Sequence, residues 1–120
     1  MKHCIAFILF LLVSCHSFGN GFIISKNQKY SIYIKQDSPK LIHYAANEMA
    51  DYLAQTTGAQ CKVKGVGRCA NNQLVVKVEG ADTLAFLSNT LKASAYDEYM
   101  IQVDDNGLTI EGGNARGVLY

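Results

Sequence analysis

The sequence lacks tryptophan, contains one proline and carries little charge. Charged residues make up 18% of its 120 residues and hydrophobic residues 49%. This composition is typical of a globular domain and unlike that of a disordered or low-complexity chain. The length suffices for one small domain, which excludes two independently folded catalytic lobes.

Neither sign of charge is in excess. Eleven Lys and Arg residues stand against ten Asp and Glu, a net charge of +1. Lys2 lies in a predicted leader, so the exported chain would be neutral. Nucleic-acid affinity comes from clustered Lys and Arg that displace counterions. The balance therefore argues against nucleic acid as the main partner, and leaves open a small acidic ligand.

No hydrophobic run is long enough to span a membrane. The longest, residues 5–13, has nine residues, whereas a transmembrane helix needs about 20. Lys2 and His3 precede this run, and a charged start before a short apolar stretch is typical of an export signal. We therefore expect export from the cytoplasm.

The end of the leader resembles a bacterial lipobox, Leu12-Val13-Ser14-Cys15. This resemblance predicts a signal peptide over residues 1–14, lipidation of Cys15, and attachment to a membrane through the lipid, as in a periplasmic or cell-surface lipoprotein. The alternative is ordinary secretory cleavage after Gly19, which follows a small-x-small pattern.

Four cysteines are present, but two fall in the leader or at the anchor, Cys4 and Cys15. The remaining pair, Cys61 and Cys69, brackets a short stretch with two glycines. An exported domain favours pairing of such cysteines, so the sequence predicts a disulfide between them. The spacing does not suit a zinc knuckle, and we expect no metal and no cofactor.

The remaining chain predicts an α+β domain over residues 29–120, preceded by a tether over residues 15–28. Alternating apolar residues predict a strand near 30–35. Ser38 and Pro39 are the expected N-cap and first residue of a long helix that ends at Gly58.

Further elements follow along the chain: strands near 61–64 and 74–78, a short helix near 82–91, a hairpin over 99–111 that turns at Asn106-Gly107, and a second helix capped by Asn114. The expected architecture is a small mixed β-sheet packed by one long helix, with the second helix truncated. The chain stops in the apolar run 118–120, which predicts an incomplete domain.

Two motifs resemble the N-terminal domains of exported bacterial glycoside hydrolases, namely family 20 β-hexosaminidases and α-glucuronidases. One is AANEMADYL at 45–53 with Thr57-Gly58, and the other is the hairpin followed by Asn114-Ala115-Arg116-Gly117-Val118-Leu119-Tyr120. The resemblance covers residues 29–120. It implies an accessory domain without catalytic residues, whose partner is a downstream catalytic barrel, and it makes Arg116 a candidate for an interdomain contact.

The acidic pairs agree with a non-catalytic role. Asp104-Asp105 is expected in a turn, Asp97-Glu98 in a solvated loop, and Glu48 with Asp51 on a helix flank. A glycosidase needs two carboxyl groups placed on either side of the scissile bond. His43 has no nearby nucleophile motif and is interpreted as structural.

Two other interpretations remain. The chain could be a free-standing lipoprotein module that binds a glycan or a protein through its sheet, with Tyr33, Tyr96 or Tyr99 stacking on the ligand. It could also be a fragment of a disrupted gene without a function of its own.

Overall fold

A computed structural model describes residues 21–80, 92, 94–105 and 107–120. Its elements, in chain order, are β1 (Lys29–Lys35), α2 (Lys40–Thr57), β2 (Gln60–Val66), β3 (Gln73–Val78), β4 (Tyr99–Asp104), β5 (Gly107–Gly112) and α3 (Ala115–Leu119). The predicted leader, Cys15 and the short helix expected near 82–91 lie outside the described residues.

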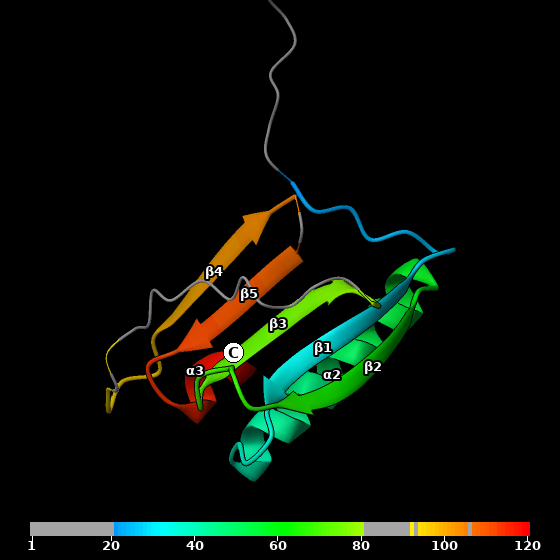
Figure 1. The fold of residues 1–120 in the computed structure, drawn as a ribbon. Helices are drawn as coiled ribbons and strands as arrows, with labels where there is room; N and C mark the ends of the chain where they lie inside the picture. The colour runs from blue at the N-terminus through cyan, green and yellow to red at the C-terminus, as the bar shows by residue number, and fades with distance from the viewer. Residues whose placement is uncertain (1–20, 81–91, 93, 106) are drawn as a thin grey trace, which may run out of the picture.

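The five strands form one mixed sheet in the order β2-β1-β3-β5-β4 (Figure 1). β1 and β2 run parallel because α2 carries the chain back between them, while β3, β5 and β4 pair antiparallel. The α+β fold class predicted from the sequence is confirmed, with a mixed sheet and one long helix.

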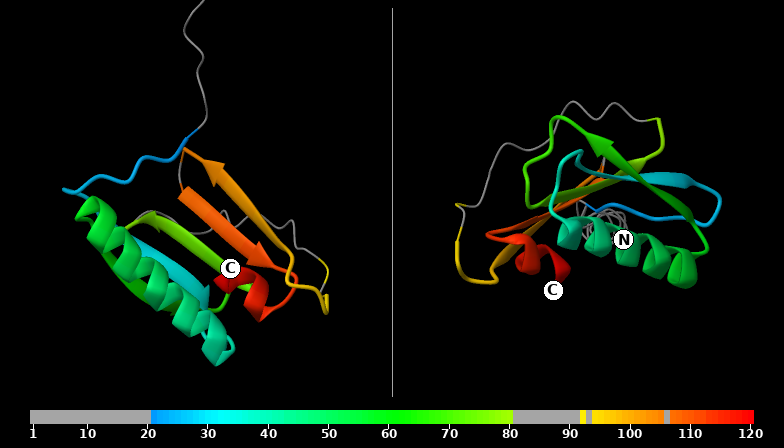
Figure 2. Two further views of the ribbon diagram at one scale, coloured as in Figure 1. Left: turned by 180° about the vertical axis from the view of Figure 1, so that it is seen from behind. Right: turned by 90° about the horizontal axis from the view of Figure 1, so that it is seen from below.

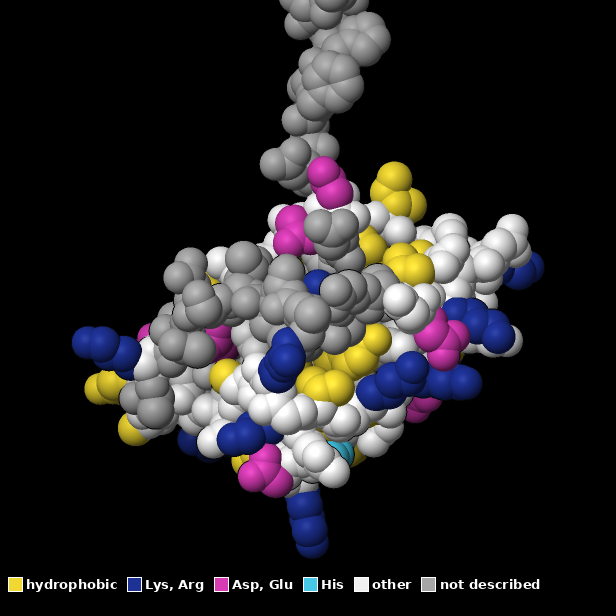
Figure 3. Space-filling view, viewed as in Figure 1, with side chains coloured by type: hydrophobic (Ala, Val, Ile, Leu, Met, Phe, Trp, Pro, Cys, Tyr) yellow, Lys and Arg dark blue, Asp and Glu magenta, His cyan; other side chains and the backbone are white. Residues whose placement is uncertain are grey.

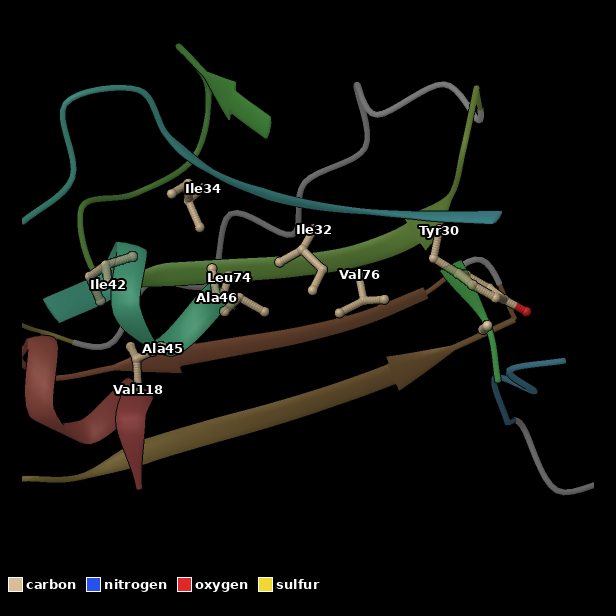
Figure 4. Packing of buried hydrophobic residues seen from close by; sticks show 10 residues of the cluster. Tyr30, Ile32, Ile34, Ile42, Ala45, Ala46, Leu74, Val76 and Val118 are labelled. Carbon is tan, nitrogen blue, oxygen red and sulfur yellow. The ribbon is translucent and has the colours of Figure 1, made fainter. Parts of the chain in front are cut away.

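The main core lies between the sheet and α2 (Figure 4). Alternate residues of β1 point to this side, and Tyr30, Ile32 and Ile34 are each at most 2% exposed. They meet Ile42 and Ala46 on α2. The period of two in the strand and the apolar stripe of the helix thus face each other, as the sequence pattern predicts.

The start of α2 differs from the prediction and its end does not. Pro39, not Ser38, occupies the N-cap, and no side chain caps the helix. The Ser38 hydroxyl is buried and has no hydrogen-bond partner in the described part of the chain. Gly58 adopts the left-handed conformation, with φ 72°, and its N–H donates to the Ala54 carbonyl oxygen. Glycine suits this position because it lacks a Cβ.

Part of the predicted tether packs onto the domain. The Phe22 ring meets the Tyr30 ring edge to face, with centroids 5.8 Å apart. The Ser25 N–H donates to the Tyr30 hydroxyl over 2.8 Å. Residues 22–25 therefore cover one end of the core, where the sequence predicted only a linker.

The β4–β5 hairpin is confirmed, but Gly107 has a different role from the one expected. It is the first residue of β5 and does not have a positive φ. A Cβ at this position would collide with the Val76 carbonyl oxygen. Its N–H donates to Asp104 Oδ1 over 2.9 Å. Glycine is needed here because β3 approaches closely.

The two helices cover the sheet unequally. α2 packs on β2, β1 and β3, whereas the five-residue α3 lies at one end of β5 (Figure 2). On this side the remaining length of β5 and β4 has no described helix over it.

Candidate interaction groove

An apolar groove of about 510 Å³ lies on the helix side of the sheet, between α2, α3 and the β4–β5 hairpin. We call it the α2–β4 groove. Its lining comprises Tyr44, Ala45, Glu48, Met49, Tyr52, Leu74, Tyr99, Ile101, Ile110, Gly117, Val118, Leu119 and Tyr120.

The groove gathers most of the large hydrophobic side chains that the described surface exposes. Eight such residues are exposed in all, and five of them line it: Tyr44, Tyr52, Tyr99, Ile101 and Tyr120. Single exposed hydrophobic residues are common on proteins, but a contiguous patch marks an interaction site or a ligand groove.

Sheet register explains why β4 contributes exposed side chains. Ile34, Leu74, Ile110 and Ile101 are paired in turn and form one row across four strands. Ile34 and Leu74 are 1% exposed under α2, whereas Ile101 is 53% exposed. All four residues of the row are apolar. Ile101 is therefore exposed because no described segment covers β4, and not because its residue type differs.

The α2 wall of the groove follows from helical spacing. Tyr44, Glu48 and Tyr52 are four residues apart, which places them on one flank of the helix. Glu48 is the one charged residue among the described residues that line the groove. The residue is partly buried, and its carboxylate has no ion-pair or hydrogen-bond partner among the described residues.

The end of the groove at α3 is held by the motif that carried the glycoside hydrolase resemblance. Asn114 caps α3 as predicted, with its Oδ1 accepting from the Gly117 N–H over 2.9 Å. Its Nδ2 donates to Asp97 Oδ1 and to the Tyr96 carbonyl oxygen. A Cβ on Gly117 would collide with the Glu98 carbonyl oxygen. The hydrogen bonds of Asn114 and the close contact at Gly117 thus hold α3 against the loop before β4.

Arg116 has a partner within the domain. Its Nε lies 3.2 Å from Asp97 Oδ1, and its side chain is 61% exposed. An ion pair with another domain is therefore not needed to account for its charge. Asp97 and Glu98 are exposed in the loop before β4, as the sequence predicted, and the Asp97 carboxylate also accepts from Asn114.

The predicted disulfide between Cys61 and Cys69 is not formed in this structure, where both are free thiols. The strand predicted near 61–64 is β2, and it extends through Val66, so most of the stretch between the two cysteines is extended and does not bend back. Cys61 pairs with Tyr30 at one end of the sheet, and Cys69 follows the other end of β2. Cys61 packs on the α2 side and Cys69 with Tyr33 and Val75 on the opposite side. A disulfide would require β2 to come apart.

Burial affects the acidity of both thiols. It raises the pKa of the Cys61 thiol, and it raises the pKa of the Cys69 thiol to about 11. Removal from water disfavours the thiolate. Both groups are therefore protonated and poorly reactive at neutral pH.

The structure separates the three candidate stacking tyrosines. Tyr33 is 7% exposed on the side of the sheet away from α2, so it is not available for stacking. Tyr96 is exposed in the loop before β4 but does not line the groove. Tyr99 lines it and is 54% exposed. The sequence did not indicate Tyr44, Tyr52 or Ile101 as site residues, and the positions of Tyr52 and Ile101 in helical and strand patterns suggested packing.

The remaining candidates lie apart from the groove. His43 is exposed near the start of α2. Asp104 accepts from the Gly107 N–H, in agreement with its predicted turn role. Among the described residues, no three His, Cys, Asp or Glu side chains lie close enough to hold a metal ion. Within the same residues, no helix is both long and apolar enough to cross a bilayer.

Among the described residues visible in Figure 3, basic side chains do not gather into one patch. Lys and Arg are spread over this view, with Asp and Glu between them (Figure 3). Lys62 and Lys64 both lie within 4.0 Å of Glu79 Oε1.

Comparisons with protein-family models, curated proteins and solved structures found no match to the chain.

Proposed function

We propose that this chain is a non-catalytic accessory domain of an exported glycoside hydrolase, and that it acts by packing its α2–β4 groove against another part of that protein. The α2–β4 groove is the observation that supports the proposed packing interaction. Five exposed large hydrophobic residues converge there, and an apolar patch of this kind favours association with another protein surface.

The groove chemistry favours binding over glycoside hydrolysis. Its described lining holds one carboxylate, that of Glu48, whereas the common glycosidase mechanisms use two across the scissile bond. Asp97 is occupied by Arg116 and Asn114. The chemistry is accordingly assigned to a separate catalytic domain, the barrel that the sequence resemblance implies.

The sequence resemblance supplies the glycoside hydrolase part of the proposal, and the leader supplies export. Residues 1–14 direct the chain out of the cytoplasm, and lipidation of Cys15 attaches it to a membrane. The accessory domain then sits between the anchor and the catalytic barrel.

Exposed tyrosine rings favour a second candidate, a free-standing module that binds a glycan. Tyr44, Tyr52 and Tyr99 line the groove, and each of these residues is more than half exposed. Aromatic rings can stack on the apolar faces of sugars, and their hydroxyls can bond to sugar hydroxyls.

Immunoprecipitation from native extracts distinguishes the two candidates. An antibody against the domain should recover a protein much larger than the 13.2 kDa chain, and the precipitate should hydrolyse an aryl glycoside. Cells lacking the gene provide the control. Recovery of a product no larger than this chain, without glycosidase activity, would overturn the hydrolase proposal. Polysaccharide binding by that product, lost in Tyr99→Ala, would establish the second candidate.

A further inference from the structure

We propose that the outer edge of β4 pairs antiparallel with the same edge of a second copy of the chain, with Gln102 facing Gln102 at the two-fold axis. Two five-stranded sheets would then join into one continuous sheet. The interaction uses the backbone edge of the strand. It goes beyond the proposed function and does not depend on it.

The sheet has two edges, β4 and β2 (Figure 1). Among the described strands, β4 pairs with β5 alone. Its other side therefore presents backbone N–H and C=O groups to which no described strand is paired, and such a row is a template for an added strand.

The ladder pattern shows which residues direct their backbone groups outward. The Gly113 N–H donates to the Glu98 carbonyl oxygen over 2.9 Å, directly before β4 begins. In an antiparallel ladder, residues that bond to the neighbouring strand alternate with residues that do not. The even-numbered residues of β4 therefore bond to β5. The backbone groups of Tyr99, Ile101 and Val103 point to the outer edge.

The two edges differ in how strongly they resist pairing. Natural edge strands avoid association through lysines, prolines and interruptions of the strand. β2 carries Lys62, Lys64 and Gly65. β4 has no charge, proline or glycine from Tyr99 to Val103, and most of this stretch is β-branched or aromatic. The β4 edge is thus the one suited to pairing, and the β2 edges of the dimer would limit further growth of the sheet.

Charge favours one register of the two copies. A two-fold axis at Ile101 would set Glu98 of one copy opposite Asp104 of the other, and both residues are exposed. Like charges directly opposite each other destabilise a strand pair. An axis at Gln102 sets Asp104 opposite Met100 instead, so these carboxylates no longer face each other.

The register centred on Gln102 also pairs apolar residues. Ile101 faces Val103 of the second copy, and this pair would exchange both of its outward backbone hydrogen bonds. β-branched pairs of this kind stabilise antiparallel strands. Moving the axis to Met100 would place Val103 opposite the Asp97 carboxylate and lose this match.

The twist of the sheet keeps the helix sides of the two copies apart. Neighbouring strands rotate by about 20–25° relative to each other. The β3 strands of the two copies are five strand steps apart in the joined sheet, so their helix sides would differ in direction by about 100° or more. Each α2–β4 groove would remain accessible to another part of its own protein.

Two matched glutamine variants test the proposal on the purified chain. Gln102 lies on β4 and Gln60 on β2, the opposite edge. An edge pair buries less surface than a standard interface of about 1,600 Å², so we expect a weak dimer in sedimentation equilibrium at micromolar concentrations. Gln102→Lys sets two lysines face to face and should weaken dimerisation at least about tenfold. Gln60→Lys should change it about twofold or less.

Opposite charges at the axis test the register. A mixture of Gln102→Lys and Gln102→Glu should form a heterodimer at least about tenfold tighter than either homodimer. Gln102→Cys should also form an intermolecular disulfide, because a facing pair of this type has Cα atoms about 4.5 Å apart. Gln60→Cys provides the control for the native thiols and should not cross-link. Failure of both the heterodimer and the cross-link would refute this register.

Other results would overturn the proposal. A chain that stays monomeric, or equal losses in Gln102→Lys and Gln60→Lys, would exclude pairing at the β4 edge. Dimerisation that survives Gln102→Lys but is lost in Tyr52→Lys would place the interface in the α2–β4 groove. A monomer that binds a peptide copying residues 99–103 would assign the edge to an extended segment of another protein. Circular dichroism checks that each variant folds.

Discussion

Two halves of one sheet differ in what covers them. Under α2, the side chains of β1 and β3 that face the helix, such as Ile32, Ile34 and Leu74, are buried, while β4 exposes Tyr99, Ile101 and Val103 on the same side of the sheet. The residue types are alike in the two halves. The comparison shows that apolar alternation places a side chain on a face, and that the cover over that face decides whether the side chain stabilises the domain or remains available to a partner.

The largest expected effect is on stability, and it appears when the two ends of the paired row, Ile34 and Ile101, are compared. Ile34→Ala should lower the free energy of unfolding by about 2 to 5 kcal/mol, because it leaves a cavity in the core. Ile101→Ala should cost about 1 kcal/mol or less, since the side chain is already 53% exposed. Urea unfolding of both variants measures the difference. Equal costs would mean that β4 is as well covered as β1.

The second prediction concerns Cys69, which is buried on the face of the sheet away from α2. The unfolded thiol ionises near its ordinary pKa of about 9, while the folded thiol stays protonated up to about 11. Its contribution to stability is therefore complete below pH 9 and lost as the pH rises to 11. The loss is about 2 kcal/mol. Cys69→Ala should show a smaller decline across this range, measured by urea unfolding under reducing conditions.

The third prediction concerns α3, the short helix at the end of β5, on the half of the sheet that α2 does not cover. Asn114→Ala removes the cap at Gly117 and the bonds to the loop before β4. We expect a loss of about 1 kcal/mol in unfolding free energy. Asn114→Asp keeps a cap acceptor but loses the Nδ2 donor to the loop, so comparison of the two variants separates the cap from the bonds to the loop. An unchanged midpoint in Asn114→Ala would show that α3 is not held by its cap.

The smallest expected effect is that of Arg116. Its ion pair with Asp97 is largely exposed, and such pairs contribute from zero to about 1 kcal/mol. Arg116→Gln should therefore leave the urea midpoint nearly unchanged, and the double variant with Asp97→Asn measures the pair itself. A large coupling energy between the two substitutions would mean that this ion pair contributes substantially to the stability of the β4–β5 half of the sheet.

Local patterns in the sequence were sufficient for the α+β class, for the long helix with its Gly58 end, for the β4–β5 hairpin and for the Asn114 cap. Each depends on residues within a few positions of one another, since periodicity, capping and turn chemistry are local effects. The sequence also placed Tyr99 among the candidate binding residues, because aromatic residues on a strand are visible in the pattern.

The tertiary structure alone decided the rest. The close approach at Gly107 and the separation of Cys61 from Cys69 depend on which segments meet across the sheet. The groove joins α2 to β4, more than forty positions later in the chain, and its exposure depends on where α2 ends its cover of the sheet. Tyr33 and Tyr99 are both strand tyrosines, yet one is buried and the other exposed. Sequence alternation determines which face each side chain takes, whereas exposure depends on the packing of distant segments, which no local pattern records.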